Sequence, residues 1–466
     1  MSFVSLPFLI FFPAVLLVTA LLPAAKLRHG ALLIASYVFY GWWDWRFCFL
    51  MLGLTAISYV TALALEKRPK SKPILAVGVT APLLTLFLFK YLNFFADSFC
   101  MAFGVKSTGA INVILPVGIS FYTFQSLSYT IDAYRGDVKV SHNPVKFALY
   151  ISFFPQLVAG PIVKASDFLP QLDEDRRPTL RRLSDGLSVF FWGMLKKAVL
   201  ADQISPFVDS VFAAPAAYAS ATVALAVVAY ALQIYFDFSG YSDMAIGCAR
   251  CLGYDLNRNF DLPYLSSNVT EFWGRWHISL SVWLKQYLYI PLGGNRKGAA
   301  RTYLNLMLTM LLGGLWHGAG LNFIFWGGLH GAALCFHKLW MKHVPPCRAG
   351  WWRILSTLLT FAFVCLCWVF FRAQNMGQAF AVLKKLFVWS DGIRQIYLWA
   401  AAALAALLLA TLWCALFRRD ERGIIHGDSP TFRLGTFRGT LGFALLIGFT
   451  LILMYTGDNP FIYFQF

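Results

Sequence analysis

A histidine lies inside an apolar stretch and has small residues on both sides. Residues 313–320 read Gly-Gly-Leu-Trp-His-Gly-Ala-Gly, within an apolar run that begins at Tyr303. A polar ring in the core of a bilayer is costly and usually has a task. Imidazole is the side chain best matched to proton transfer near neutral pH. The sequence therefore predicts a catalytic or orienting role for His317.

The spacing around His317 allows two interpretations. If residues 303–321 are helical, positions 306, 310, 313, 314 and 317 share one face. Missing side chains beside the imidazole would then leave a slot for substrate. The alternative is a close helix crossing of small residues, with His317 merely bonded across it. The residues that we predict to line the slot or to contact the imidazole are Met310, Gly313, Gly314, Trp316 and Asn322.

A second polar stretch covers residues 233–243 and reads Gln-Ile-Tyr-Phe-Asp-Phe-Ser-Gly-Tyr-Ser-Asp. It lies at the junction between two apolar runs. One interpretation is a buried turn in which Asp237 or Ser239 caps the next helix. The other is that Tyr235 and Asp237 help to shape a polar cavity.

A third polar stretch contains His277. Glu271, Arg275 and His277 precede a run whose Trp and Tyr residues suit a headgroup boundary,. As chemistry, His277 could bind polar groups of a donor or assist proton movement. As structure, it would be an interfacial histidine bonded to Glu271 or to a backbone carbonyl. His330 and His337, on the next apolar run, are weaker candidates.

These side chains must be positioned by membrane helices. Hydrophobic residues make up 59% of the 466 positions and charged residues only 13%, which excludes a soluble globule of this size,. We expect an all-α polytopic protein with about a dozen spans plus re-entrant or interfacial helices. The predicted long spans are 3–23, 47–65, 73–91, 111–130, 218–236, 303–321, 322–340, 352–372, 395–417 and 439–457. Shorter or interrupted runs are 30–43, 147–163, 186–200, 238–253 and 276–292.

The net charge of +17 reflects topology and not nucleic-acid binding, because the Lys and Arg residues lie between the apolar runs,. Placing the basic clusters in the cytoplasm puts both termini on the opposite side of the membrane, with an uncleaved first helix. Residues 373–394 carry Lys384, Lys385 and Arg394 on that outer side. Apolar residues recur there at helical spacing, which predicts an amphipathic interfacial helix. The nine cysteines form no paired framework and no metal site,.

Several motifs in combination resemble one family. They are LPVGISFYTFQ at 115–125, FPQLVAGPI at 154–162, the polar stretch at 235–243, RWH at 275–277, YIPLGGNR at 289–296 and LWHG at 315–318. The chain resembles the membrane-bound O-acyltransferases over most of its length. Within that family it is similar to the bacterial branch that acetylates polysaccharides, more than to the branch that attaches D-alanine to teichoic acid.

The resemblance implies a ring of helices around a thinned centre crossed by a tunnel, with His317 at the narrowest point and His277 at the second polar position. It implies a single membrane domain over 1–466, with a catalytic core at 111–340. It further implies acetyl transfer from a cytosolic thioester, such as acetyl-coenzyme A, to a hydroxyl, with no bound cofactor and no metal.

The resemblance also implies a location and partners. We expect a bacterial inner-membrane protein in contact with lipid. The partner would be a periplasmic or membrane-anchored polysaccharide acetyltransferase, or an acyl carrier protein. The polymer, alginate, cellulose or another, stays open. D-alanyl transfer and a non-catalytic transporter or flippase are the alternatives.

Overall fold

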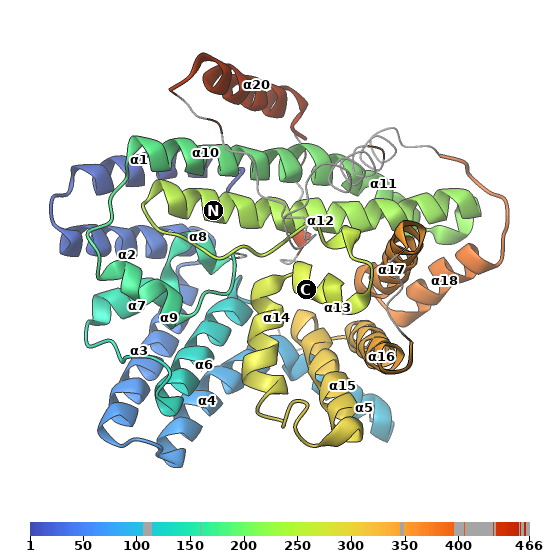
Figure 1. Cartoon of the computed structure of the whole chain (residues 1–466), viewed down its shortest axis with the longest axis horizontal. Coiled ribbons are helices and arrows are strands. Elements are labelled where there is room, and N and C mark those ends of the chain that lie inside the picture. Colours follow the sequence, from blue (N-terminus) through green and yellow to red (C-terminus); the bar gives the residue numbers. More distant parts are fainter. Residues whose placement is uncertain are drawn as a thin grey trace. The chain divides into compact units, whose positions relative to one another are not determined.

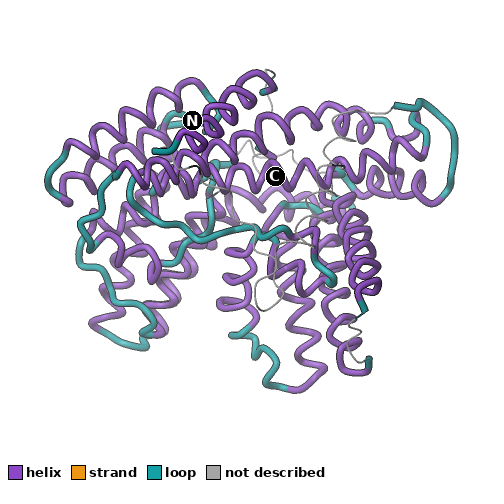
Figure 2. Tube along the Cα trace, turned by 45° about the horizontal axis from the view of Figure 1, so that its top comes forward, coloured by secondary structure: helices purple, strands orange, loops and turns teal. Residues whose placement is uncertain are grey.

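The computed structural model of the chain describes residues 1–105, 114–158, 160–344, 349–395, 405, 432, 435–455, 457 and 461–462. The regular structure of these residues is helical, and Figure 2 draws no strand among them. A single isolated bridge pairs Tyr218 with Ile393. The predicted all-α class is confirmed.

The first part of the chain forms short and long helices in succession (Figure 1). They are α1 (Leu6–Leu21), α2 (Ala25–Gly41), α3 (Arg46–Lys67), α4 (Lys72–Leu86), α5 (Leu92–Phe103), α6 (Ile119–Arg135), α7 (Pro144–Ser152), α8 (Phe154–Leu157), α9 (Ala165–Phe168), α10 (Leu180–Met194) and α11 (Asp202–Ala213). The π-helical turns η1 (Phe87–Tyr91) and η3 (Leu195–Ala201) join α4 to α5 and α10 to α11. The 3-10 turns η2 (Leu169–Leu172) and η4 (Pro215–Ala217) follow α9 and α11.

The second part carries the candidate histidines. Its helices are α12 (Ser220–Cys251), α13 (Val269–Arg275), α14 (Ile278–Leu284), α15 (Gly298–His317), α16 (Leu321–His343), α17 (Gly350–Arg372), α18 (Met376–Phe387) and α20 (Phe437–Leu453). The 3-10 turn η5 (Pro263–Leu265) precedes α13, and the π-helical turn η6 (Lys285–Tyr289) follows α14. Several helices begin at an asparagine whose side chain accepts an orphan backbone N–H. At the start of α13 the Asn268 side chain accepts from the Glu271 amide, and at the start of α18 the Asn375 side chain accepts from the Gln378 amide.

The described residues pack into two compact units. The first unit contains residues 1–192, 241–257 and 430–446, and the second contains 193–240, 258–429 and 447–466. The core of the second unit is built where α15 packs along α16 and where α16 in turn packs against α17 and α13 (Figure 1). His317 and Asn322 are buried in this core, and the same unit contains Tyr235, Asp237 and His277.

Four helical stretches in the described residues are long and apolar enough to cross a bilayer. They are Arg46–Lys67, Lys72–Phe103, Ser220–Cys251 and Gly350–Arg372, and Leu6–Leu21 and Phe437–Leu453 are shorter apolar helices. Most predicted spans correspond to one helix. The predicted run at 147–163 is instead broken between α7 and α8, and the span predicted at 395–417 lies outside the described residues apart from positions 395 and 405.

The prediction of a turn within 233–243 is wrong. The runs 218–236 and 238–253 form one uninterrupted helix, α12, of 32 residues. Asp237 does not end the helix because its carboxylate pairs with Lys197 (2.5 Å between Oδ1 and Nζ). Gly240 does not end it either, because a Cβ there would lie 2.7 Å from the carbonyl oxygen of Gly193. Asp237 and Gly240 therefore both pack against the helical segment formed by α10 and η3.

The helix predicted within 373–394 is confirmed as α18. Its buried face carries Ala379 and Val382, whereas Phe380 and Phe387 are exposed. The helix packs against α17, α16 and the turn η4. Exposed aromatic rings suit a lipid-facing side, so an interfacial position remains our prediction.

Candidate functional site

His317 is the last residue of α15, and the chain turns sharply after it. Gly318 and Gly320 are extended, and the Gly320 amide donates to the Gly318 carbonyl (3.0 Å). A side chain at Gly318 would overlap the ring of Phe323 on α16. The glycine is therefore required by the close return of the chain, and this return fixes where the imidazole lies.

Aromatic rings enclose the His317 imidazole. Ring centroids lie 4.9 Å away at Trp316, 5.1 Å at Trp326 and 5.2 Å at Phe371, all edge-on. The side chain is only 4% exposed. Such an enclosure keeps bulk water from the imidazole, which strengthens electrostatic interactions around it.

His277 has an unusual backbone conformation. It lies between α13 and α14 with φ 45° and ψ 54°, in the left-handed region that non-glycine residues rarely adopt,. Strain of this kind persists only where the surroundings hold it. Here the Ile278 amide donates to the Asn259 carbonyl (2.9 Å), and the Ser279 amide donates to Asn259 Oδ1 (3.2 Å).

Asn259 also fixes the protonation pattern of His277. Asn259 Oδ1 accepts from the backbone amide of Ser279 and from its hydroxyl (2.9 Å), so this atom is the amide oxygen and not the nitrogen,. The same oxygen lies 3.1 Å from His277 Nδ1. A neutral His277 must then carry its proton on Nδ1, which leaves Nε2 as the basic nitrogen.

The structure brings the two predicted histidines together. The His277 and His317 ring centroids are 6.4 Å apart, and Trp316 lies 6.1 Å from His277. His277 is fully buried, and Phe238 of α12 packs edge-on against it with centroids 4.7 Å apart. The two imidazoles thus lie close together among aromatic rings.

The glycines before His317 pack closely against other helices. A Cβ on Gly314 would overlap the Phe323 carbonyl oxygen and lie 3.2 Å from the Cα of Gly327. A Cβ on Gly327 would in turn overlap the carbonyl of Met310, and one on Gly313 would meet Leu284 at 3.2 Å. For Gly314 the packing therefore matches the alternative interpretation, a small-residue helix crossing. Met310 takes part in the same crossing.

Asn322 and Tyr235 are both buried. Asn322 Nδ2 donates to the carbonyls of Phe370 (3.2 Å) and Ala373 (2.8 Å), so this donor ties α16 to the end of α17 and does not serve His317. The Tyr235 ring packs against those of Tyr264 (5.5 Å) and Trp276 (6.4 Å).

The remaining polar candidates are held by local partners. Glu271, a predicted hydrogen-bond partner of His277, instead pairs with Arg275 (2.8 Å). Trp273 Nε1 donates to Nδ1 of the buried His330 (3.3 Å), and His337 Nδ1 lies 2.8 Å from the Thr270 hydroxyl.

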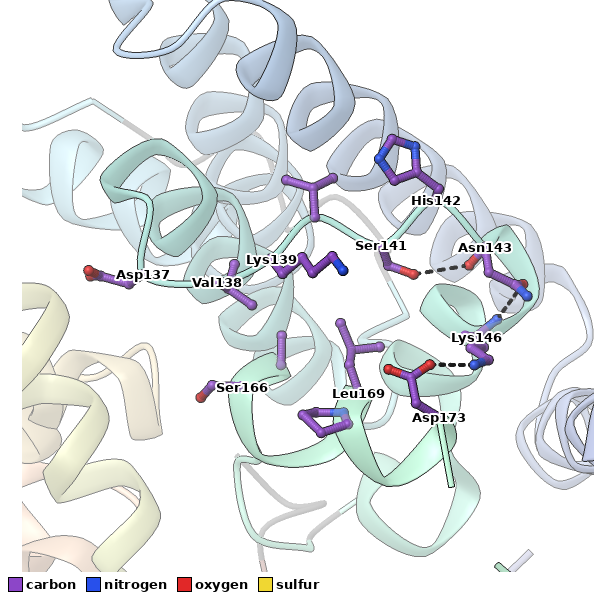
Figure 3. A pocket seen from close by; sticks show the side chains of 13 residues that line it. Asp137, Val138, Lys139, Ser141, His142, Asn143, Lys146, Ser166, Leu169 and Asp173 are labelled. Atoms are coloured by element: carbon purple, nitrogen blue, oxygen red, sulfur yellow. Dashed lines mark hydrogen bonds and ion pairs between the residues drawn. The ribbon is translucent and has the colours of Figure 1, made fainter. Parts of the chain in front are cut away.

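A pocket of about 530 Å³ lies in the first unit and contains none of the predicted site residues (Figure 3). It is lined by the loop after α6 together with α9 and η2. Its two lysines, Lys139 and Lys146, are matched by Asp137 and Asp173, and Lys146 bonds to Asp173 (2.5 Å). The balanced charge gives this pocket no preference for an anionic or cationic ligand.

Three contributors to the site gave no signal in the sequence. Asn259 is a lone polar residue in a loop, and Trp326 and Phe371 read as ordinary apolar helix positions. Only the pairing of helices shows that they surround the histidines. Among the described residues no group of three His, Cys, Asp or Glu side chains could hold a metal ion.

Comparison with known proteins gives a consistent result. Residues 42–380 match the model of the membrane-bound O-acyltransferase family. A probable alginate O-acetylase of Pseudomonas aeruginosa is 41% identical, over 88% of this chain and 79% of that protein. A peptidoglycan O-acetyltransferase of Helicobacter pylori is 36% identical, over 89% and 82% of the two chains. A teichoic acid D-alanyltransferase of Bacillus subtilis is 27% identical, over 67% and 81%.

Proposed function

The chain belongs to the membrane-bound O-acyltransferase family, and on this premise we propose that it transfers acetyl groups for the O-acetylation of an exopolysaccharide. The observation that carries the proposal is the pair of buried imidazoles, 6.4 Å apart in an aromatic enclosure. Relatives named for acetyl transfer to alginate and to peptidoglycan support the acetyl group. The D-alanyltransferase relative is more distant.

His317 is the general base in this proposal. It accepts the proton of the acceptor hydroxyl while the hydroxyl oxygen attacks the thioester carbonyl carbon. The carbon–sulfur bond breaks as the new ester forms, and the imidazolium returns the proton to the departing thiolate. A thioester is already activated, so the step needs a base, donors to the developing oxyanion and a dry site.

His277 positions the acceptor. Asn259 holds its Nδ1 proton, so Nε2 is the nitrogen that accepts a hydrogen bond. An accepting nitrogen near a second imidazole can orient a hydroxyl before its proton is transferred. Trp316, Trp326 and Phe371 exclude water around His317.

The donor, the partner and the orientation are parts of the same proposal. We assign acetyl-coenzyme A as the cytosolic donor and a periplasmic or membrane-anchored acetyltransferase as the partner that modifies the polymer. The protein then lies in the inner membrane with both termini in the periplasm, and residues 111–340 form the catalytic core. The tunnel that would connect the two faces stays a prediction.

The test uses a matched pair of histidine variants. His317→Ala is expected to abolish polymer acetylation in cells while protein level and membrane insertion persist. His337→Ala is the control, because His337 lies on the same unit and bonds to Thr270 away from the enclosure. Normal acetyl content in the His317→Ala strain would refute the assignment.

A labelling experiment separates the other function classes. Purified protein with its partner in detergent is given radiolabelled acetyl-coenzyme A, with no sealed compartment and no gradient. An acetyltransferase forms labelled product under these conditions, whereas a transporter or flippase needs closed vesicles. Label incorporated from a D-alanyl thioester but not from the acetyl thioester would favour the D-alanyl alternative.

A further inference from the structure

A buried ionic cluster lies beside the histidines in the second unit. Lys197 Nζ contacts Asp202 Oδ1 (2.7 Å) and Asp237 Oδ1 (2.5 Å), and the three side chains are 4%, 8% and 2% exposed. One lysine contacts two carboxylates, so its single charge is shared between them. A buried carboxylate is stable only if further donors satisfy it.

The C-terminal segment supplies such a donor. The backbone amide of Ile462 donates to Asp237 Oδ2 (2.8 Å). Phe461 and Ile462 are only 3% and 6% exposed. A chain segment more than 200 residues away in sequence thus donates a hydrogen bond to the cluster.

Residues near Lys197 also form hydrogen bonds with residues 453 and 455, which precede Phe461 in the sequence. The Tyr455 amide donates to the Ala198 carbonyl (2.8 Å), and Gln203 Nε2 donates to the Leu453 carbonyl (3.1 Å). Ala198 lies in the π-helical turn η3, which also supplies Lys197. π-helical turns displace the regular ladder of backbone bonds and occur often at functional sites. Here the displaced carbonyl accepts from the C-terminal segment.

Aromatic side chains in contact with one another connect the C-terminal segment to the two candidate histidines. Phe461 lies 5.7 Å from Phe238, which follows Asp237 on α12. Phe238 packs edge-on against His277 at 4.7 Å, and His277 lies 6.4 Å from His317. Aromatic rings in close-packed interiors transmit displacement because few voids can absorb it.

We propose that the Lys197–Asp202–Asp237 cluster anchors Phe461 and Ile462, and that Phe461 is a positioning residue which sets the His277 ring through Phe238. This inference rests on the proposed acetyl transfer. It makes the C-terminal segment part of the catalytic core, whereas the family resemblance had placed that core at 111–340. In this proposal Asp237 holds the C-terminal segment, whereas the sequence suggested that it helps to shape a polar cavity.

Two variants test separately the hydrogen bond between Asp237 and Ile462 and the contribution of the Phe461 ring. Asp237→Ala removes the acceptor of the Ile462 amide, and Phe461→Ala removes the ring while leaving the ionic cluster intact. Phe461→Leu keeps apolar volume and serves as the rescue variant. Asp209→Asn is the matched control for charge, because Asp209 is half-exposed and pairs with Arg372 elsewhere in the unit.

The first measurement tests the anchor without using activity. A carboxypeptidase digests the full chain in detergent, and mass spectrometry shows where trimming stops. We expect the parent protein and Asp209→Asn to retain Phe461 and Ile462, and Asp237→Ala to lose both. Equal loss from the parent and Asp237→Ala would overturn the anchor, whatever the activity of either.

The second measurement tests positioning. Acetyl transfer in membrane vesicles is followed at varied acetyl-coenzyme A concentration. Phe461→Ala should lower kcat by about tenfold or more with KM unchanged, since a displacement near 1 Å costs on the order of 100-fold. Phe461→Leu should recover part of this loss. A raised KM with normal kcat, or no change at all, would overturn positioning. Failure of the proposed function itself would appear separately, as full activity in His317→Ala.

Discussion

Asn259 provides the sharpest test of how the site is organised. Its Oδ1 accepts from His277 Nδ1 (3.1 Å), the Ser279 amide (3.2 Å) and the Ser279 hydroxyl (2.9 Å). In Asn259→Ala all three buried donors lose this acceptor, although the serine hydroxyl and the imidazole can turn elsewhere. A buried donor left unsatisfied costs about 1–3 kcal/mol, so we expect a loss of about 2–5 kcal/mol in stability.

The same variant should lose activity through His277. Without Oδ1 the imidazole is free to rotate and to move its proton to Nε2, the nitrogen that must accept. General acid–base and orienting groups contribute about 10²- to 10⁴-fold, so acetylation should fall by about 100-fold. The assay is acetyl incorporation into polymer at matched protein level, beside a thermal melting curve in detergent.

Ser279→Ala separates the two effects. It removes one hydrogen bond to the same oxygen and leaves the His277 contact in place. We expect a stability loss of about 1 kcal/mol with nearly full activity. Normal acetylation by Asn259→Ala would show that Asn259 does not hold the Nδ1 proton of His277 in place. That role of Asn259 is also contradicted if Ser279→Ala loses as much activity as Asn259→Ala.

Two further predictions concern packing and charge. Gly314→Ala should destabilise the protein by about 1–3 kcal/mol, because its new methyl overlaps the Phe323 carbonyl, whereas Gly328→Ala, whose methyl meets only a leucine at 3.5 Å, should melt like the parent,. Equal melting of the two variants would contradict the helix crossing. The hydrogen bond from Arg177 holds the pKa of Asp175 below its usual 3.8, so this carboxylate stabilises the fold above that pH and ceases to do so as the pH falls through the lowered pKa,. Melting curves should therefore separate the parent from Asp175→Asn at pH 6 and converge in acid, and a gap that widens in acid would be the wrong sign.

The sequence predicted the helical class, which is confirmed, and it singled out His277 and His317 as candidate site residues, because hydropathy and an isolated imidazole are local signals. It did not predict that α12 is continuous. The polar residues at 233–243 suggest a break in the helix as long as their partners are not known. The partner of Asp237 is Lys197, which lies 40 positions earlier in the chain and cannot be identified from the local sequence. The same limit applies to Gly314, whose close contact with Gly327 depends on which helix packs beside α15. Loop residues such as Asn259 become meaningful only after the chain has folded around them.

The pairing of Lys197 with Asp237 also bears on how the protein enters the membrane. Each residue alone would present an isolated charge to lipid, at about 2.5–3.5 kcal/mol in insertion measurements at a helix centre. In the folded protein the ammonium of Lys197 lies 2.5 Å from the Asp237 carboxylate and so offsets its charge, while it also contacts Asp202. We therefore expect residues 193–240 to leave the translocon as one hairpin, with the earlier segment retained until α12 has been synthesised.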